Sequence, residues 1–390
     1  MNRINFRLPE TNHKYLKLKI GIIGGGQLAR MIMEECYKFG FEFYILSKEK
    51  NSPAGQITNN ELTGDWNDEE CLKKFSEACD IITLENEFID HSKIEFLERQ
   101  GKPVYPDSRI IKLIQDKLYQ KETLKKLNIP VSDFCKVDST EEIIEFARKN
   151  NYPVMLKSRT MGYDGKGNFE IRTEKDIDEA CKVLSGRGEL MCERFVRFDK
   201  EIATQAVRSR SGEIKIYPVV ETIQKDHICK YVIASQKQYK EIQEKVNNIA
   251  EKILTETNYT GVMGIEMFLT GNEILVNELA PRVHNSGHYT IEGSQTSQFE
   301  NHVRAILDMP LGETSLKADN AVMINILGER DGIAQTNGFN EVLKNKNSYI
   351  HIYGKQETRK GRKMGHITVL SEDPDQAMSL ANQNRENFFI

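Results

Sequence analysis

The N-terminal third of the chain alternates short apolar segments with helix-like segments, and this alternation limits the folds that it can adopt. Apolar segments at 19–23, 42–46 and 80–84 have the length of buried strands, and a helix is expected over 68–79. Strands that alternate with helices form βαβ units and a parallel sheet. We therefore predict a doubly wound parallel α/β domain here, followed by one continuous helix over 110–127.

The pattern changes after Pro153. Strand-like segments dominate from 154 to 217, and a long amphipathic helix is expected over 237–255. Two further strand-like segments, 348–353 and 366–370, lie near the end of the chain. This order predicts an α+β domain followed by a small, mostly β region.

Composition excludes several functional classes. The 390 residues allow two or three domains at about 150 residues each. With 54 basic and 58 acidic residues the net charge is -4, which argues against nucleic-acid binding through overall charge. No apolar run approaches the ~20 residues that span a bilayer, and the seven cysteines form no C-x-x-C pair. We expect a cytoplasmic protein with reduced thiols and with neither nucleic-acid nor membrane partners.

A glycine turn follows the first expected strand. Gly24, Gly26 and Ala29 fit the spacing of a dinucleotide fingerprint, in which glycines let phosphate approach a helix N-terminus. The second strand ends in Ser47, however, where a nicotinamide site needs an acid for the ribose hydroxyls. A phosphate or small anion at this turn is therefore favoured over a plain structural turn, and both over NAD.

A second glycine-rich segment begins at Lys157, where an expected strand ends. Gly162, Gly165 and Gly167 lie within six residues and separate charged and hydroxyl side chains. Such a loop offers free N–H donors to phosphate oxygens and is too flexible to serve as a packing element. A hairpin turn would need only two or three of these residues, so phosphate binding is the favoured interpretation.

Two glutamates are expected to face each other across a hairpin. If the turn centres on Asn272, Phe268 pairs with Val276 and Glu266 pairs with Glu278. Like charges directly opposite are destabilising unless one is protonated or a cation lies between them. Mg²⁺ binds carboxylates together with substrate phosphates, so we predict a metal site at this pair. The alternative is two unrelated surface glutamates on a shifted register.

The hairpin is followed by an unusually polar segment, 279–288, which contains Arg282, His284, Asn285 and Ser286. Polar loops beside carboxylates more often bind ligands than fill a core. Either histidine of this segment could be an ordinary hydrogen-bonded residue, and neither is assigned as a base.

Together these motifs resemble those of one enzyme family. The strand with Gly-Gly-Gly-Gln-Leu, the loop Gly-Tyr-Asp-Gly-Lys-Gly, the segment Asn-Glu-Leu-Ala-Pro-Arg-Val-His-Asn-Ser-Gly-His at 277–288 and the glycine-interrupted basic segment at 351–366 resemble 5-(carboxyamino)imidazole ribonucleotide synthase, an ATP-grasp enzyme of purine biosynthesis. The resemblance implies carboxylation of aminoimidazole ribonucleotide by bicarbonate, with ATP and Mg²⁺, through carboxyphosphate in a homodimer.

The resemblance also implies a three-part organisation. It predicts a pre-ATP-grasp βαβ domain at 18–110, an ATP-grasp domain at 111–315 and a small C-terminal domain at 316–390. Residues 1–17, which precede these three parts, are expected to form an N-terminal extension.

Position by position, the resemblance implies the following site residues. ATP would be held by Lys117, Lys157, Gly162, Tyr163, Asp164, Gly165, Lys166, Gly167, Asn168, the adenine-reading strand Glu193, Arg194, Phe195 and Val196, and by Glu201, Gln224, Asn277 and Glu278. The ribonucleotide and carboxyphosphate would contact Gly25, Gly26, Gln27, Leu28, Glu85, Glu87, Tyr163, Lys166, Arg282, His284, Asn285, Ser286, Lys355 and Arg362. Glu266 and Glu278 would hold Mg²⁺, and catalysis would depend on Asp164, Arg282 and Lys355, with Asp164 guiding a proton from the substrate amine.

Two departures from the family pattern keep other functions open. Lys117 replaces an expected Arg, and Gln224 replaces an expected His. The alternatives are a formate-using transformylase or a biotin carboxylase of the same superfamily, and a nucleotide-binding module without turnover.

Overall fold

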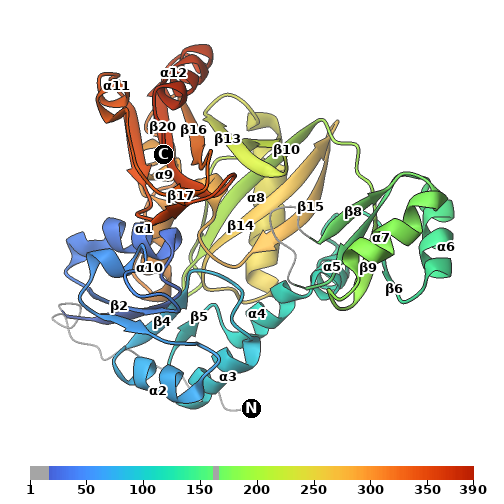
Figure 1. Ribbon diagram of the computed structural model, residues 1–390, viewed down its shortest axis with the longest axis horizontal. Coiled ribbons are helices and arrows are strands. Elements are labelled where there is room, and N and C mark those ends of the chain that lie inside the picture. The colour runs from blue at the N-terminus through green and yellow to red at the C-terminus, as the bar shows by residue number, and fades with distance from the viewer. Residues whose placement is uncertain (1–16, 161–166) are drawn as a thin grey trace.

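The computed structural model describes residues 17–160 and 167–390. Its N-terminal part is a parallel five-stranded sheet of order β3-β2-β1-β4-β5 (Figure 1), as the alternating pattern predicts. The strands are β1 (Lys19–Ile23), β2 (Glu42–Ser47), β3 (Glu61–Thr63), β4 (Ile81–Leu84) and β5 (Val104–Tyr105). The central strands β1 and β4 are buried on both faces of this sheet, which is why they are almost entirely apolar.

Helices cover the two faces of the N-terminal sheet. On one face Ile20 and Ile22 pack with residues of α1 (Gln27–Cys36) and of the distant α10 (Gln298–Ile306). On the other face Ile23 packs with residues of three helices. These helices are α2 (Glu69–Glu77), α3 (His91–Arg99) and α4 (Ser108–Gln115). The packing against α10 joins the N-terminal sheet to the centre of the molecule.

The prediction of a single helix over 110–127 is wrong. The chain forms α4 and then α5 (Lys117–Lys126), separated by Asp116 in an extended conformation. The Asp116 carboxylate accepts hydrogen bonds from the N–H groups of Leu118 and Tyr119 and so caps the start of α5. The apolar spacing continues across the break, so periodicity alone does not reveal it.

A small lobe, green in Figure 1, projects from the rest of the molecule. Its antiparallel sheet has the order β6-β9-β7-β8, and α6 (Thr140–Asn150) and α7 (Ile177–Leu184) pack on one face with the core residues of the lobe. The strands are β6 (Phe134–Val137), β7 (Val154–Ser158), β8 (Asn168–Ile171) and β9 (Leu190–Arg194).

The largest sheet runs through the centre of the molecule in the order β15-β14-β10-β12-β13-β16-β20-β18, with β11 (Ile214–Ile216) added at β10. Its central strands are β10 (Lys200–Arg208), β12 (Val220–Lys225), β13 (Ile228–Ser235), β14 (Gly261–Thr270) and β15 (Glu273–Ala280). The long helix α8 (Lys240–Glu256) packs on the same core cluster as β14 and β15. The order shows that this sheet continues without a break into the C-terminal region.

The C-terminal region, red in Figure 1, contributes β16 (Asn320–Leu327), β18 (Ser348–Ile352) and β20 (Lys363–Ser371) to that sheet. The short elements around them are α9 (Thr290–Gly293), β17 (Gly332–Ile333), α11 (Phe339–Leu343), β19 (Glu357–Thr358) and α12 (Pro374–Glu386). Within the described ranges, no helix has both the length and the apolar character needed to cross a bilayer.

Candidate active site

The hairpin of β14 and β15 brings the two predicted carboxylates opposite each other. Glu266 pairs with Glu278 as expected, but Phe268 pairs with Leu275 and not with Val276. The turn contains only Gly271 and Asn272, so the register near the tip differs by one residue from the predicted one. A bulge beside Glu266 then restores the predicted pairing of the glutamates.

The bulge leaves Asn277 as an extra residue between two paired positions of β15. Asn277 and Glu278 both line the same cavity, whereas successive residues of a regular strand point to opposite faces. The bulge therefore places an amide and a carboxylate together beside Glu266.

This cavity of about 300 Å³, which we call the central cavity, collects eleven of the predicted site residues. They come from the N-terminal domain, the small lobe, the large sheet and the polar segment that follows it. The predicted residues that line it are Glu87, Asn168, Glu201, Gln224, Glu266, Asn277, Glu278, Arg282, His284, Asn285 and Ser286.

The electrostatics of the acidic pair agree with the expected repulsion. Burial, and then the neighbouring charges of Glu278 and Glu201, together raise the pKa of Glu266 to about 7. Lys117 Nζ lies 2.5 Å from Glu278 Oε1, so the lysine that departs from the family pattern still supplies a cation there. His284 Nε2 lies 3.5 Å from Glu266 Oε1, but burial and then Arg282 lower the pKa of His284, which makes it a neutral neighbour.

This donor set fits a divalent cation that also binds substrate oxygens. Across the described ranges no group of three or more His, Cys, Asp or Glu side chains converges as a self-sufficient metal site. Two carboxylates and an amide are the kind of partial set that Mg²⁺ uses when phosphates and water complete its shell. Burial first, and then Glu278 and Glu201, raise the pKa of Glu266 and so disfavour two ionised carboxylates here without a cation.

Lys157, predicted to bind phosphate, lies at the end of β7 and forms an ion pair with Glu193. Its Nζ is 2.6 Å from Glu193 Oε2. The same carboxylate binds Lys121 Nζ at 2.7 Å and accepts a short hydrogen bond from the Ser132 hydroxyl. Burial favours the neutral acid, but the two ammonium groups outweigh it and hold the pKa of Glu193 far below its ordinary value. Glu193 is therefore ionised, and its side chain is fully engaged inside the protein.

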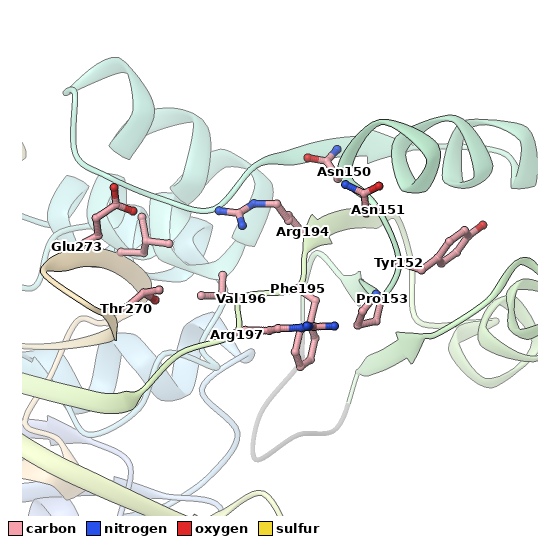
Figure 2. Close-up of a pocket in the computed structure, with 11 residues that line it drawn as sticks. Asn150, Asn151, Tyr152, Pro153, Arg194, Phe195, Val196, Arg197, Thr270 and Glu273 are labelled. Carbon is pink, nitrogen blue, oxygen red and sulfur yellow. The ribbon is translucent and has the colours of Figure 1, made fainter.

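The next predicted residues, Arg194, Phe195 and Val196, line a different cavity of about 380 Å³ beside the connection from the small lobe to the large sheet. Figure 2 shows the side chain of Arg194 extending toward Glu273, whereas the side chain of Tyr152 points in the opposite direction. Because Arg194 and Glu193 are successive strand residues, they point to opposite faces of β9. That the backbone of this segment reads the adenine base stays a prediction.

The glycine turn carries a carboxylate of the protein itself. Glu85 accepts a hydrogen bond from the Ala29 N–H at 3.3 Å, in the first turn of α1, and another from Gly26. A Cβ at Gly26 would lie 2.5 Å from Glu85 Oε1, so this close approach requires glycine. The Glu85 carboxylate therefore takes the place predicted for a phosphate or small anion at this turn. Gln27 and Leu28 are the first residues of α1, which follows the turn.

Arg282 connects this turn to the central cavity. Its Nε and Nη2 bind the two carboxylate oxygens of Glu87 at 2.5 and 3.0 Å, a bidentate contact that Lys could not reproduce. Burial raises the pKa of Glu85, while the charges of Arg282 and Lys355 act to lower it. Lys355, whose Nζ also donates to the Lys363 carbonyl at 2.6 Å, therefore lies in the same electrostatic neighbourhood.

The polar segment is held by buried amides that the sequence analysis did not identify. Asn285 and Asn325 exchange two side-chain hydrogen bonds of 3.0 and 2.8 Å. Gln205 donates to the Ser286 hydroxyl at 2.7 Å, and Gln298 bonds both the N–H and the carbonyl of His284. These bonds fix three successive predicted ligands, and no local motif in the sequence marks their partners.

The central cavity also contains residues outside the predicted set: Thr222, His227, Cys229 and Lys363. Lys363 follows Arg362 in the basic segment, but Arg362 itself donates to the Glu357 carbonyl at 2.7 Å and is absent from the described lining of the cavity. The alternation of side chains between the two faces of β20 could have indicated Lys363, and not Arg362, as the residue that faces the cavity. Gly162, Tyr163, Asp164, Gly165 and Lys166 lie outside the described residues, and Gly167 is the first residue after that gap.

Comparisons with known proteins agree with this arrangement. A ribonucleotide synthetase preATP-grasp domain matches residues 17–115, an ATP-grasp domain matches 122–299, and a phosphoribosylaminoimidazole carboxylase C-terminal domain matches 321–379. A solved N5-carboxyaminoimidazole synthase of Aspergillus clavatus, in complex with ADP and 5-aminoimidazole ribonucleotide, is 34% identical with a TM-score of 0.86, over 95% of this chain and 99% of that chain.

Two curated relatives define the family more closely. The chain is 40% identical to the phosphoribosylaminoimidazole carboxylase of Ogataea methanolica over 90% of its length, but it spans only 66% of that longer relative. It is 37% identical to the N5-carboxyaminoimidazole ribonucleotide synthase of Bacillus subtilis, over 92% of both chains. The identity and near-complete overlap show that this chain belongs to the N5-carboxyaminoimidazole ribonucleotide synthase family.

Proposed function

We propose that the chain carboxylates 5-aminoimidazole ribonucleotide with bicarbonate at the expense of ATP, giving the N5-carboxylated ribonucleotide, ADP and phosphate. One observation carries this proposal. The central cavity joins the acidic pair of the β14–β15 hairpin to Arg282, His284, Asn285 and Ser286 within about 300 Å³. A phosphate-activating site and a polar substrate site thus share one chamber.

In the first step, a bicarbonate oxygen forms a bond to the γ-phosphorus of ATP while the bond to the β-phosphate bridging oxygen breaks. Lys157 neutralises the phosphates, and Glu201 and Asn277 hold the nucleotide. Mg²⁺, held by Glu266 and Glu278, supplies positive charge to the phosphate oxygens when it is bound.

In the second step, the substrate amine forms a bond to the carboxyl carbon, phosphate leaves with its oxygen, and the nitrogen loses one proton. Arg282 is positioned by Glu87 to hold an anion, and Lys355 and Arg362 are proposed to contribute to the same task. Asp164 is the proposed guide for the proton. The neutral His284, held at its backbone by Gln298, presents its ring as an uncharged hydrogen-bonding group.

The wider setting of this activity is also a proposal. We infer a homodimer in the cytoplasm that acts on ATP, bicarbonate and the ribonucleotide as small-molecule substrates. The domain boundaries at 17/18, 110/111 and 315/316 remain proposals of the same kind.

The test is ADP release by the purified chain with Mg²⁺ and ATP, with the ribonucleotide present or omitted and with bicarbonate added or depleted. We expect release to require both compounds. ADP release that is indifferent to either compound, or that requires formate, would exclude the proposed reaction.

A further inference from the structure

The helix α5 carries two lysines, one turn apart, that form ion pairs with glutamates of two different strands. Lys117 binds Glu278 on β15, and Lys121 binds Glu193 on β9. Lys121 Nζ also donates to the Val276 carbonyl at 3.1 Å. The proposed metal-binding hairpin and the small lobe are therefore both attached to one helix.

Lys121 is not a ligand-facing residue. Its side chain is 4% exposed, and in the described part of the chain its acidic partner is Glu193 alone. A buried lysine needs a reason to be retained, because its desolvation costs several kcal/mol unless an anion compensates for it. Here the anion is one that a second lysine, Lys157, also contacts.

The charges of this cluster explain what Lys121 contributes. Glu193 carries one negative charge, and Lys121 and Lys157 carry two positive charges, which leaves a net charge of about +1. Without Lys121, the carboxylate at 2.6 Å would cancel the charge of Lys157, and the cluster would be neutral. Phosphate groups approaching Lys157 would then meet an ion pair in place of a net cation.

We propose that Lys121 is a positioning residue that neutralises Glu193 and so keeps the positive charge of Lys157 available for the ATP phosphates. This inference rests on the proposed function, in which Lys157 binds those phosphates. The charge of Lys121 acts through Glu193, its contact with the Val276 carbonyl being one to a neutral group, and the recognition of the base and ribose stays unchanged.

The experiment measures dissociation constants of ATP and of uncharged adenosine for Lys121→Met, which has nearly the same length without the charge. We expect ATP to bind about 10-fold more weakly, the scale of one charge-assisted contact, and adenosine to bind within about twofold of the unchanged chain. Lys125→Met is the matched control, because Lys125 lies one turn later on the exposed side of α5, over the ring of Phe134.

A second variant tests the charge argument directly. Lys121→Met combined with Glu193→Gln removes one charge of each sign and returns the net charge to about +1, so ATP binding should recover to within about threefold. Equal weakening of ATP and adenosine, no weakening of ATP, or a double variant as weak for ATP as Lys121→Met would each overturn the inference.

The unchanged chain separates this inference from the proposed function. If ADP release requires the ribonucleotide and bicarbonate but Lys121→Met binds ATP normally, the reaction stands and the role of Lys121 is wrong. If release does not require them, the proposed reaction fails whatever the variant does.

Discussion

The molecule contains two carboxylate sites of opposite character, one partly exposed and one buried. At the β14–β15 hairpin, Glu266 and Glu278 face each other, and the pKa of Glu266 is raised to about 7, first by burial and then by its acidic neighbour. At the end of β9, Glu193 lies between two lysines, and its pKa is strongly lowered. One site has too little positive charge, and the other has a surplus.

The comparison shows that burial alone does not decide the protonation of a carboxylate. Loss of solvent raises the pKa of both glutamates, but at Glu193 two lysines reverse this shift, whereas at Glu266 the acidic neighbours add to it. A site short of positive charge suits a cation, and a site with surplus positive charge suits phosphates. A magnesium–nucleotide complex presents both kinds of charge at once.

The sharpest way to break this comparison is Glu278→Gln. It removes a proposed metal ligand and leaves Lys117 without its partner, so we expect kcat/KM for ATP to fall at least about 100-fold. The measurement is steady-state ADP release over a range of Mg²⁺ concentrations. Glu273→Gln, an exposed acid on the same strand, is the control. Activity unchanged at all Mg²⁺ concentrations would show that this pair does not hold the metal.

Lys157→Met tests the opposite site. The variant loses an ammonium group that is proposed to bind phosphates and leaves Glu193 paired with Lys121, so KM for ATP should rise about 10- to 100-fold. KM for the ribonucleotide should change far less. Lys149→Met, an exposed lysine on α6, is the matched control. Equal effects on the two KM values would contradict a role specific to the nucleotide.

The pH dependence of Mg²⁺-dependent ATP binding should sharpen the difference between the two sites. A cation binds the ionised form of Glu266, so affinity should increase as pH rises, by up to about tenfold per unit below the pKa of about 7, and level off above it. Isothermal titration from pH 5.5 to 8.5 measures this slope. The slope should flatten in Glu266→Gln, and an equally steep slope in that variant would assign the titration to another group.

The smallest effect is on stability. Because the folded-state pKa of Glu266 lies above its ordinary value, its ionisation destabilises the ligand-free fold increasingly as pH rises from about 4.5 to about 7. Glu266→Gln should therefore raise the free energy of unfolding at pH 8. Its side chain is 34% exposed, so solvent screening limits the gain to about 1 kcal/mol.

Urea unfolding without nucleotide or Mg²⁺ measures this gain. It should be present at pH 8 and vanish near pH 4, where the native glutamate is protonated in any case. Glu273→Gln should show neither effect. A loss of stability in Glu266→Gln at pH 8 would mean that the carboxylate already has a compensating partner.

The fold and the acidic pair could be predicted because they follow from local patterns. Apolar strand segments and an assumed turn centred on Asn272 placed Glu266 opposite Glu278, and this pairing is confirmed although the register near the tip is not. The bulge at Asn277 was not predictable, because a two-residue turn and a bulge together give the same glutamate pairing as the assumed turn. The break at Asp116 was hidden for a similar reason, since apolar spacing continues through it.

The ion-pair and hydrogen-bond partners of the site residues could not be predicted, because they are distant in sequence. Lys121 and Glu193 are 72 residues apart, and Asn285 and Asn325 are 40 apart. Neither pair belongs to a motif, and their proximity follows from how the lobes pack. Residues proposed to contact substrate left a signal in the sequence, whereas the residues that support them did not.

The continuity of the large sheet affects how the chain can be divided. β13 pairs with β16 over five residues, although the ATP-grasp match ends at 299 and the C-terminal match begins at 321. A polypeptide cut between them would leave the N–H and C=O groups of β13 along a bare edge, a template for aggregation. A minimal soluble fragment should therefore contain both the ATP-grasp region and the C-terminal region. If a protease separates the two regions, they are expected to precipitate.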